Sequence, residues 1–173
     1  DPRLGDFSMP APGLLRFSDI DPGPLPEDPE DIAFAPVPVL AAWLARGALT
    51  SRALTEIYLA RIEALNPRRF CFAAVTPHRA LAEADRADQL RAAGTDLGPL
   101  QGIPYAVKDL FDTEGIATGW GAEPFRDCIP DSNAAVVERL HEAGAVLLGK
   151  SSLGALAMGD VWYGGTTRNP WNL

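Results

Sequence analysis

The hexapeptide Ile103-Pro-Tyr-Ala-Val-Lys108 is a short apolar run that ends on a lysine and is followed by Asp109. A run of this length, bounded by polar residues, predicts a β-strand. Because side chains alternate between the two faces of a strand, Lys108 shares one face with Ala106, whereas Asp109 points to the other. We therefore do not expect Asp109 to be the ion-pair partner of Lys108.

Lys108 is a candidate general base. Lys108 and Lys150 are the only lysines in the chain, and each lies at or near the C-terminal end of a predicted strand, where α/β proteins usually place ligands. A partly buried lysine without a neighbouring acid loses hydration of its ammonium group, which favours the neutral amine that can accept a proton. The alternative is that the Lys108 side chain extends from the strand end into solvent and has no chemical role.

Helical and extended patterns alternate around this strand. The pattern predicts an α/β protein whose sheet is covered by helices. Apolar residues at helical spacing, together with glycine and proline breaks, place helices at 39–46, 51–66, 77–93 and 132–143, with Asp131 or Ser132 as the cap of the last one. The strands fall at 70–75, 103–108 and 145–148.

The first 38 residues differ from the rest of the chain. They hold nine of the sixteen prolines and a cluster of acidic residues. Proline removes backbone donors and fixes φ, so a long helix or central strand is excluded here. The sequence predicts an acidic arm over 1–38 that lies over a neighbouring surface or is partly disordered, followed by the start of a domain over 39–173.

The composition narrows the class of protein. With 173 residues, 47% hydrophobic residues and a net charge of −8, the chain is long enough for one domain or the front part of a larger one. Its acidity disfavours direct binding to nucleic acid, and no apolar stretch is long enough to cross a bilayer. The two cysteines, Cys71 and Cys128, are expected to be buried thiols. No metal site is expected, because histidine is scarce and neither cysteine has ligand-like spacing.

The segment Gly144–Ser151 matches the phosphate-binding expression GxxxxGK[ST] letter for letter. In a true phosphate loop the strand precedes the first glycine, and the intervening residues wrap the phosphate with backbone amides. Here a helix precedes Gly144, and the intervening Ala-Val-Leu-Leu favours the strand itself. Nucleotide binding through Lys150 and Ser151 therefore remains only as the weaker interpretation.

Four ordered blocks resemble the amidase signature family. They are Pro99-Leu-Gln-Gly-Ile-Pro-Tyr-Ala-Val-Lys-Asp-Leu-Phe-Asp112, Gly144-Ala-Val-Leu-Leu-Gly-Lys-Ser-Ser-Leu153, Ala157-Met-Gly159 and Gly165-Thr-Thr-Arg-Asn-Pro-Trp171. They occur in the order and with the spacing of that family, and the helices predicted at 39–65 and 77–93 also fit its N-terminal region. The resemblance implies an α/β/α sandwich with a mixed central sheet, incomplete in this chain.

The resemblance also implies a chemistry. Members of this family hydrolyse carboxylic amides with a Ser-cisSer-Lys triad and no cofactor, and Lys108 stands at the position of the catalytic lysine. Both triad serines would follow the block that ends at Trp171, beyond Leu173, so the chain is expected to be inactive by itself. Ser151 and Ser152 align with a pair that is mainly structural in the family, and they are not expected to replace those serines.

Two further residues match a loop that borders the acyl site in the family, Met158 and Gly159. The implied partners are a small-molecule amide and the remaining C-terminal part of the same domain. Arg168 and Asn169 are expected to hold the loop in place rather than to contact substrate.

Alternatives to a simple amidase remain open. One is the A-type component of a tRNA-dependent amidotransferase, although Gly154 and Ala155 stand where such components usually carry acidic residues. Another is a non-catalytic fragment that kept the fold and lost the site. The sequence favours a cytoplasmic protein, but it begins at Asp1, so a removed leader with export to the periplasm or outside the cell stays open. A homodimer is compatible with the sequence.

Overall fold

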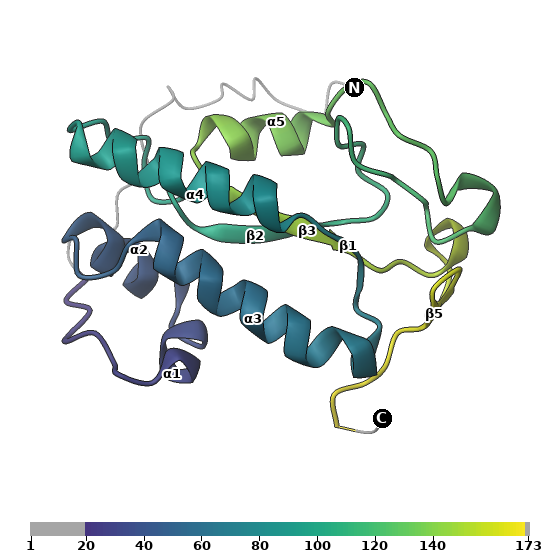
Figure 1. The fold of residues 1–173 in the computed structure, drawn as a ribbon, viewed down its shortest axis with the longest axis horizontal. Coiled ribbons are helices and arrows are strands. Elements are labelled where there is room, and N and C mark those ends of the chain that lie inside the picture. The colour runs from purple at the N-terminus through teal and green to yellow at the C-terminus, as the bar shows by residue number, and fades with distance from the viewer. Residues whose placement is uncertain (1–19, 172–173) are drawn as a thin grey trace, which may run out of the picture.

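Three strands form the central sheet in the computed structural model, which describes residues 20–171 (Figure 1). They are β1 (Phe72–Val75), β2 (Pro104–Lys108) and β3 (Val146–Ser151), in the order β1-β3-β2. Strand β1 is antiparallel to β3, whereas β2 is parallel to it. The sheet is therefore mixed, as expected for the amidase signature fold.

Two helices, α3 (Ser51–Arg69) and α4 (Pro77–Ala92), cover one face of the sheet. Val146 and Leu148 of β3 pack there against small residues of α4 and against apolar side chains of α3. In Figure 1 the strands run between α4 and α3, which lies below them in the view. This helical layer explains why β3 is apolar on the face that carries Val146 and Leu148.

The other face is covered by the shorter helix α5 (Ala135–Glu142). Val137 of α5 is fully buried and packs with Leu147 of β3 and Val107 of β2. Since apolar residues of β3 point alternately to the two helical layers, the strand is a continuous apolar run. The layered arrangement of helix, sheet and helix confirms the predicted α/β/α class.

A bulge in β3 changes the face of the residues that follow it. Tyr105 pairs with Leu147, but two residues later Val107 pairs with Lys150, so β3 uses one residue more than β2. Lys150 therefore lies on the same face as Val107, under the α5 layer. Gly149 lies within the bulge at φ +154°, where a Cβ atom would come 2.3 Å from the backbone oxygen of Ala74 in β1.

The described part of the predicted arm packs against the domain. Two helices, α1 (Pro29–Ala33) and α2 (Val37–Ala45), lie within or overlap residues 20–38. Ile32 of α1 is buried in a cluster with side chains of α2 and α3, and the indole N–H of Trp43 donates a hydrogen bond to a backbone carbonyl of the arm at 3.1 Å. The boundary predicted at residue 38 thus falls inside α2. Residues 1–19, the other half of the arm, lie outside the described residues.

Helix α3 extends past the proline that was expected to end it. Pro67 lies in the last turn, where only one hydrogen bond is lost, and the helix stops when Phe70 adopts a left-handed conformation at φ 54°. The side-chain oxygen of Asn66 accepts the backbone N–H groups of Cys71 and Phe72 at 2.9 and 2.8 Å. Because of these bonds, the strand that follows, β1, is shorter than the predicted strand.

Helix α5 begins later than predicted. Neither Asp131 nor Ser132 caps it; the N-cap is Ala134, whose backbone N–H donates to the carbonyl of Asp112 at 2.8 Å. The side chain of Asn133 instead accepts the backbone N–H of Glu114 at 2.9 Å. These two contacts fix the residues before the helix to the loop after β2, and they delay the first helical turn.

The segment after β3 forms only short elements. They are the 3₁₀ turn η2 (Ala155–Ala157) and a two-stranded hairpin of β4 (Val161–Trp162) and β5 (Gly165–Thr166). A further 3₁₀ turn, η1 (Glu123–Phe125), lies in the long connection between β2 and α5. Among residues 20–171, no helix is both long and apolar enough to cross a membrane.

The bulge makes a prediction about stability. Gly149→Ala should destabilise the fold by at least ~3 kcal/mol, because it adds a backbone clash with β1 to the strain of a positive φ. Gly47→Ala is the matched control: Gly47 also has a positive φ, but open space surrounds its Cβ position, so only the strain of ~1–2 kcal/mol should remain. Urea unfolding followed by circular dichroism measures both values. Equal losses in the two variants would show that the contact with β1 is not tight.

Candidate functional site

Lys108 is the last residue of β2, and its side chain is exposed together with that of Ala106 on the same face. The partial burial expected for Lys108 is therefore wrong for the described chain, since the face of β2 that carries Ala106 and Lys108 is exposed. The alternation of faces is as predicted: Val107 and Asp109 are buried on the opposite side. The site thus has an uncovered lysine on one face and a buried carboxylate on the other.

The buried carboxylate of Asp109 forms an ion pair with Lys150. The Nζ atom of Lys150 lies 3.5 Å from Oδ1 of Asp109, and the side chains are 0% and 1% exposed. Burial lowers the pKa of Lys150, and the negative charge of Asp109 opposes that shift. Lys150 also donates a hydrogen bond to the hydroxyl of Thr118. The predicted strand ends before Lys150, so the pattern does not predict this pair; the one local signal is Gly149, because a glycine that interrupts a strand can mark a bulge.

Two loop groups complete the environment of Asp109. The backbone N–H of Gly119 donates to the carboxylate at 3.2 Å, and the hydroxyl of Tyr163 donates to Oδ2 at 3.1 Å. Burial, followed by the charge of Asp109, raises the pKa of Tyr163 to about 12, so its hydroxyl keeps its proton and acts as donor at neutral pH. The ring of Tyr163 lies against Gly119, where a Cβ atom would come 2.5 Å from it.

Met158 and Gly159 follow η2 in an exposed loop, and Met158 is 76% exposed. The two residues before Met158, Leu156 and Ala157, have φ values of 53° and 66°. Non-glycine residues in this left-handed region are uncommon and often occur at functional sites. The backbone of the loop packs on Gly154, where a Cβ atom would lie 2.2 Å from the carbonyl oxygen of Gly159.

Backbone hydrogen bonds connect this loop to the end of β2. The N–H of Trp120 donates to the carbonyl of Asp109 at 2.9 Å, and the N–H of Leu156 donates to the carbonyl of Trp120 at 2.8 Å. Trp120 is itself left-handed, at φ 50°. The structure therefore links the neighbourhood of Lys108 to the loop of Met158 through one intervening residue, although the two lie far apart in the sequence.

Ser151 and Ser152 are part of the framework of this region. Ser151 pairs with Lys108 across the parallel strands, and its carbonyl accepts the backbone N–H of Asp109 at 3.0 Å. Ser152 is buried, and its hydroxyl lies 2.7 Å from that of Thr167. The backbone N–H of Arg168 donates to the carbonyl of Arg69 at 2.8 Å. These contacts fasten the segment after β3 to the end of α3.

The phosphate-loop pattern is not a loop in the structure. Residues Val146–Ser151 form the central strand, and Val146 to Lys150 are all buried. The ammonium of Lys150 is occupied by Asp109 and Thr118 and cannot reach a phosphate at the surface. The structure therefore offers no cradle for a nucleotide at this segment.

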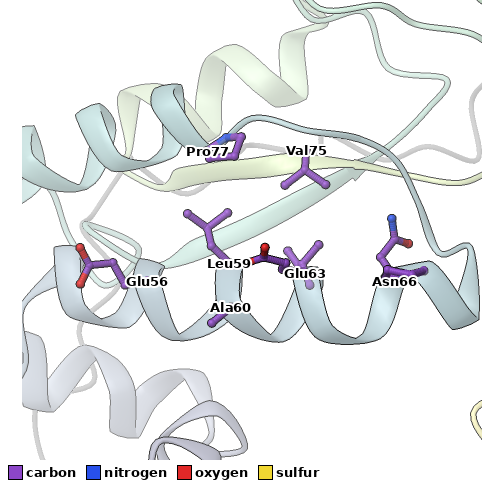
Figure 2. A pocket seen from close by; sticks show the side chains of 9 residues that line it. Glu56, Leu59, Ala60, Glu63, Asn66, Val75 and Pro77 are labelled. Carbon is purple, nitrogen blue, oxygen red and sulfur yellow. The ribbon is translucent and has the colours of Figure 1, made fainter.

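A groove of about 630 Å³ lies elsewhere, between α3 and the junction of β1 with α4. Figure 2 shows Leu59 on α3 beneath Val75 and Pro77, with Glu56 and Asn66 towards the two ends of the view. None of the residues predicted for the site lines this groove. It is therefore not part of the candidate active site.

The cysteines differ from expectation. Cys128 is exposed and Cys71 is half-buried, and both are free thiols. Cys71 lies just after α3, where the side chain of Asn66 holds its backbone, and Cys128 lies in the open connection that contains η1. Within residues 20–171, no group of three or more His, Cys, Asp or Glu side chains is arranged to bind a metal ion.

The chain belongs to the amidase family, whose family model matches residues 53–173. Among curated proteins, it is 46% identical over 139 residues to the glutamyl-tRNA(Gln) amidotransferase A subunit of Synechococcus sp. (strain WH7803). It is 43% identical over 137 residues to the protein of the same name from Streptomyces coelicolor. These alignments cover 77% and 78% of this chain but only 28% of each relative, so the chain spans less than a third of their length.

Solved structures give the same result. The peptide amidase of Stenotrophomonas maltophilia is 37% identical with a TM-score of 0.75, over 80% of this chain and 30% of that enzyme. A fatty acid amide hydrolase is 25% identical with a TM-score of 0.77, over 86% of this chain and 27% of that enzyme. The sheet and helices described above are thus the N-terminal part of an amidase fold.

The buried strand predicts that Gly144–Ser151 binds no nucleotide. Titration calorimetry of the chain with ATP-Mg²⁺ or GTP-Mg²⁺ should show no saturable heat, because Lys150 is already paired inside the protein. A site of micromolar affinity that disappears in a Lys150→Ala variant that is still folded, and is retained in Arg46→Ala, an exposed cation elsewhere, would contradict this prediction.

Proposed function

We propose that the complete protein hydrolyses a carboxylic amide through a serine acyl-enzyme, with Lys108 as the general base. Membership of the amidase family supports the reaction class. The observation that supports the role of Lys108 is its position: it ends a strand of the sheet, within the matched region, on a face that the described residues leave uncovered. The two serines would lie in the region of the complete protein that corresponds to the part of the longer relatives not covered by this chain.

The proposed reaction follows from the chemistry of these groups. The neutral amine of Lys108 accepts a proton through the bridging serine, and the nucleophilic serine attacks the amide carbonyl. The C–N bond breaks, the proton is passed to the leaving amine, and an acyl-serine remains. Water then hydrolyses this ester and restores the enzyme, so no metal or organic cofactor is required.

We also propose that Met158 and Gly159 border the acyl part of the substrate. Their loop is exposed, is held in an uncommon backbone conformation and is hydrogen-bonded through Trp120 to the residue after Lys108. The remaining part of the domain would cover the face that carries Lys108 and enclose the substrate between that part and this loop.

Substitution of Lys108 tests the proposal in the complete protein. Lys108→Ala should lower kcat for amide hydrolysis by at least ~10²–10⁴-fold, the usual contribution of general base catalysis. Lys108→Arg should be nearly as inactive, because a guanidinium remains protonated at working pH and cannot accept the proton. Steady-state kinetics on a panel of simple amides, with melting temperatures for each variant, measures these effects.

A matched control distinguishes loss of the base from loss of a surface charge. Arg46→Ala removes an exposed cation that follows α2 and pairs with Asp21, outside the candidate site, and should leave kcat unchanged. If Lys108→Arg retained most of the wild-type rate, Lys108 would be a structural cation and the proposed mechanism would be wrong.

The 173-residue chain by itself should not hydrolyse amides, because the proposed mechanism takes both serines from outside it. Incubation with the same panel of amides, followed by detection of the released amine, provides the test. Turnover by this chain that is lost in Lys108→Ala would show that its own residues supply a nucleophile.

A second candidate function is that of a component of an amidotransferase acting on glutamyl-tRNA(Gln). It is supported by the 46% identity to the Synechococcus protein, although Gly154 and Ala155 replace acidic residues expected in that class. The complete polypeptide separates the two functions when it is assayed alone. Efficient hydrolysis of simple amides without tRNA or partner proteins supports the amidase, whereas activity only with both added supports the amidotransferase.

A further inference from the structure

The buried charges next to Lys108 have no role in the proposed reaction. Asp109 and Lys150 are both essentially inaccessible, and Asp109 collects donors from three other segments of the chain. These donors are the ammonium of Lys150 in β3, the backbone N–H of Gly119 in the following loop and the hydroxyl of Tyr163 after β4. One carboxylate therefore joins four segments at the end of β2.

Stability does not explain why this site is charged. Moving two charges out of water is costly, and a well-packed apolar pair of similar volume is often as stable as a buried ion pair or more stable. Each charge nevertheless needs the other, because an uncompensated buried charge would be strongly unfavourable. What an apolar pair could not reproduce is the directional hydrogen bonding to Gly119 and Tyr163, which fixes the two loops at defined positions.

The network acts on Lys108 through the backbone. Asp109 is the next residue, its N–H donates to the carbonyl of Ser151 at 3.0 Å, and its carbonyl accepts the N–H of Trp120 at 2.9 Å. The carbonyl of Lys108 accepts the N–H of Phe111 at 3.0 Å. The peptide groups around Lys108 are therefore held in place, while its side chain remains free on the opposite face.

We propose that Asp109 is a positioning residue for Lys108: its carboxylate, neutralised by Lys150 and bonded to Gly119 and Tyr163, fixes the end of β2 and the adjoining loops so that the Lys108 amine meets the reacting serines. The proposal rests on the proposed function, in which Lys108 is the base. Reacting groups need placement within a fraction of an ångström, and an error of about 1 Å can cost 10²-fold in rate.

The test uses the complete protein with both charges removed together. In Asp109→Asn/Lys150→Met no uncompensated charge is left in the interior, so the protein should remain folded. Its kcat should fall about 10- to 100-fold with little change in KM, because the base is displaced while substrate binding is retained. Asp85→Asn is the matched control: it neutralises a carboxylate in a half-exposed ion pair with Arg52 and should leave kcat unchanged.

Tyr163→Phe keeps both charges and removes one hydrogen bond to Asp109. This variant should lower kcat about 3- to 10-fold, because one of the contacts that fix the carboxylate is lost. The measurement tests the proposal even if the double variant does not fold. Wild-type kcat in a folded double variant, or in Tyr163→Phe where the double variant is unfolded, would overturn the positioning role.

The background of Lys108→Met separates positioning from a general loss of structure. If Asp109 acts through Lys108, then Asp109→Asn/Lys150→Met should cause no further loss from the residual rate of Lys108→Met. An additional loss of the full size would contradict the proposal. The proposed function and the positioning role are refuted by different results. An active Lys108→Met protein refutes the proposed function and, with it, the positioning role. An inactive Lys108→Met protein, together with wild-type kcat in Asp109→Asn/Lys150→Met, refutes the positioning role alone.

Discussion

The extra residue in β3 is the constraint on which the region around Lys108 depends. Without it, alternation would place Lys150 under α3 and α4, on the face of Val146 and Leu148. With it, Lys150 is beside Val107 and close to Asp109. The bulge is possible because Gly149 has no side chain where β1 crosses closely. Gly149 therefore allows Asp109 and Lys150 to form their ion pair, and the loops that lead to Met158 are bonded to this pair.

Most of the fold follows from local patterns, because helices and strands appear where apolar residues recur at the matching spacing. The predicted ends of helices and strands are wrong where a side-chain contact that the spacing of apolar residues does not reveal fixes the backbone, as when Asn66 holds the chain beyond Pro67. The prediction of the site fails for the same reason. Lys108 could be named from a motif, but its exposure depends on what else covers that face. The pair of Asp109 and Lys150 depends on a register shift between strands and on loops that fold back to them, so the sequence pattern could not reveal it.

The chain contains the N-terminal framework of the amidase family. The chain covers less than a third of its longer relatives, yet it contains the layered sheet and the strand that ends at Lys108. Similarity to a peptide amidase, a fatty acid amide hydrolase and amidotransferase components shows that one N-terminal framework accompanies several named activities. In such a family, we expect differences in substrate to lie in exposed loops more than in the sheet beneath them.

The contacts of Asp109 also have a consequence for the order of folding. Its donors Gly119 and Tyr163 lie 10 and 54 residues further along the chain. The long loop to Tyr163 must close before that hydroxyl reaches the carboxylate, and loop closure costs conformational entropy. We therefore expect the carboxylate to keep its water until β3 has joined the sheet, and the Met158 loop to order after the sheet has formed. A contact made this late affects the rate of unfolding more than the rate of folding, so weakening it shortens the lifetime of the native state.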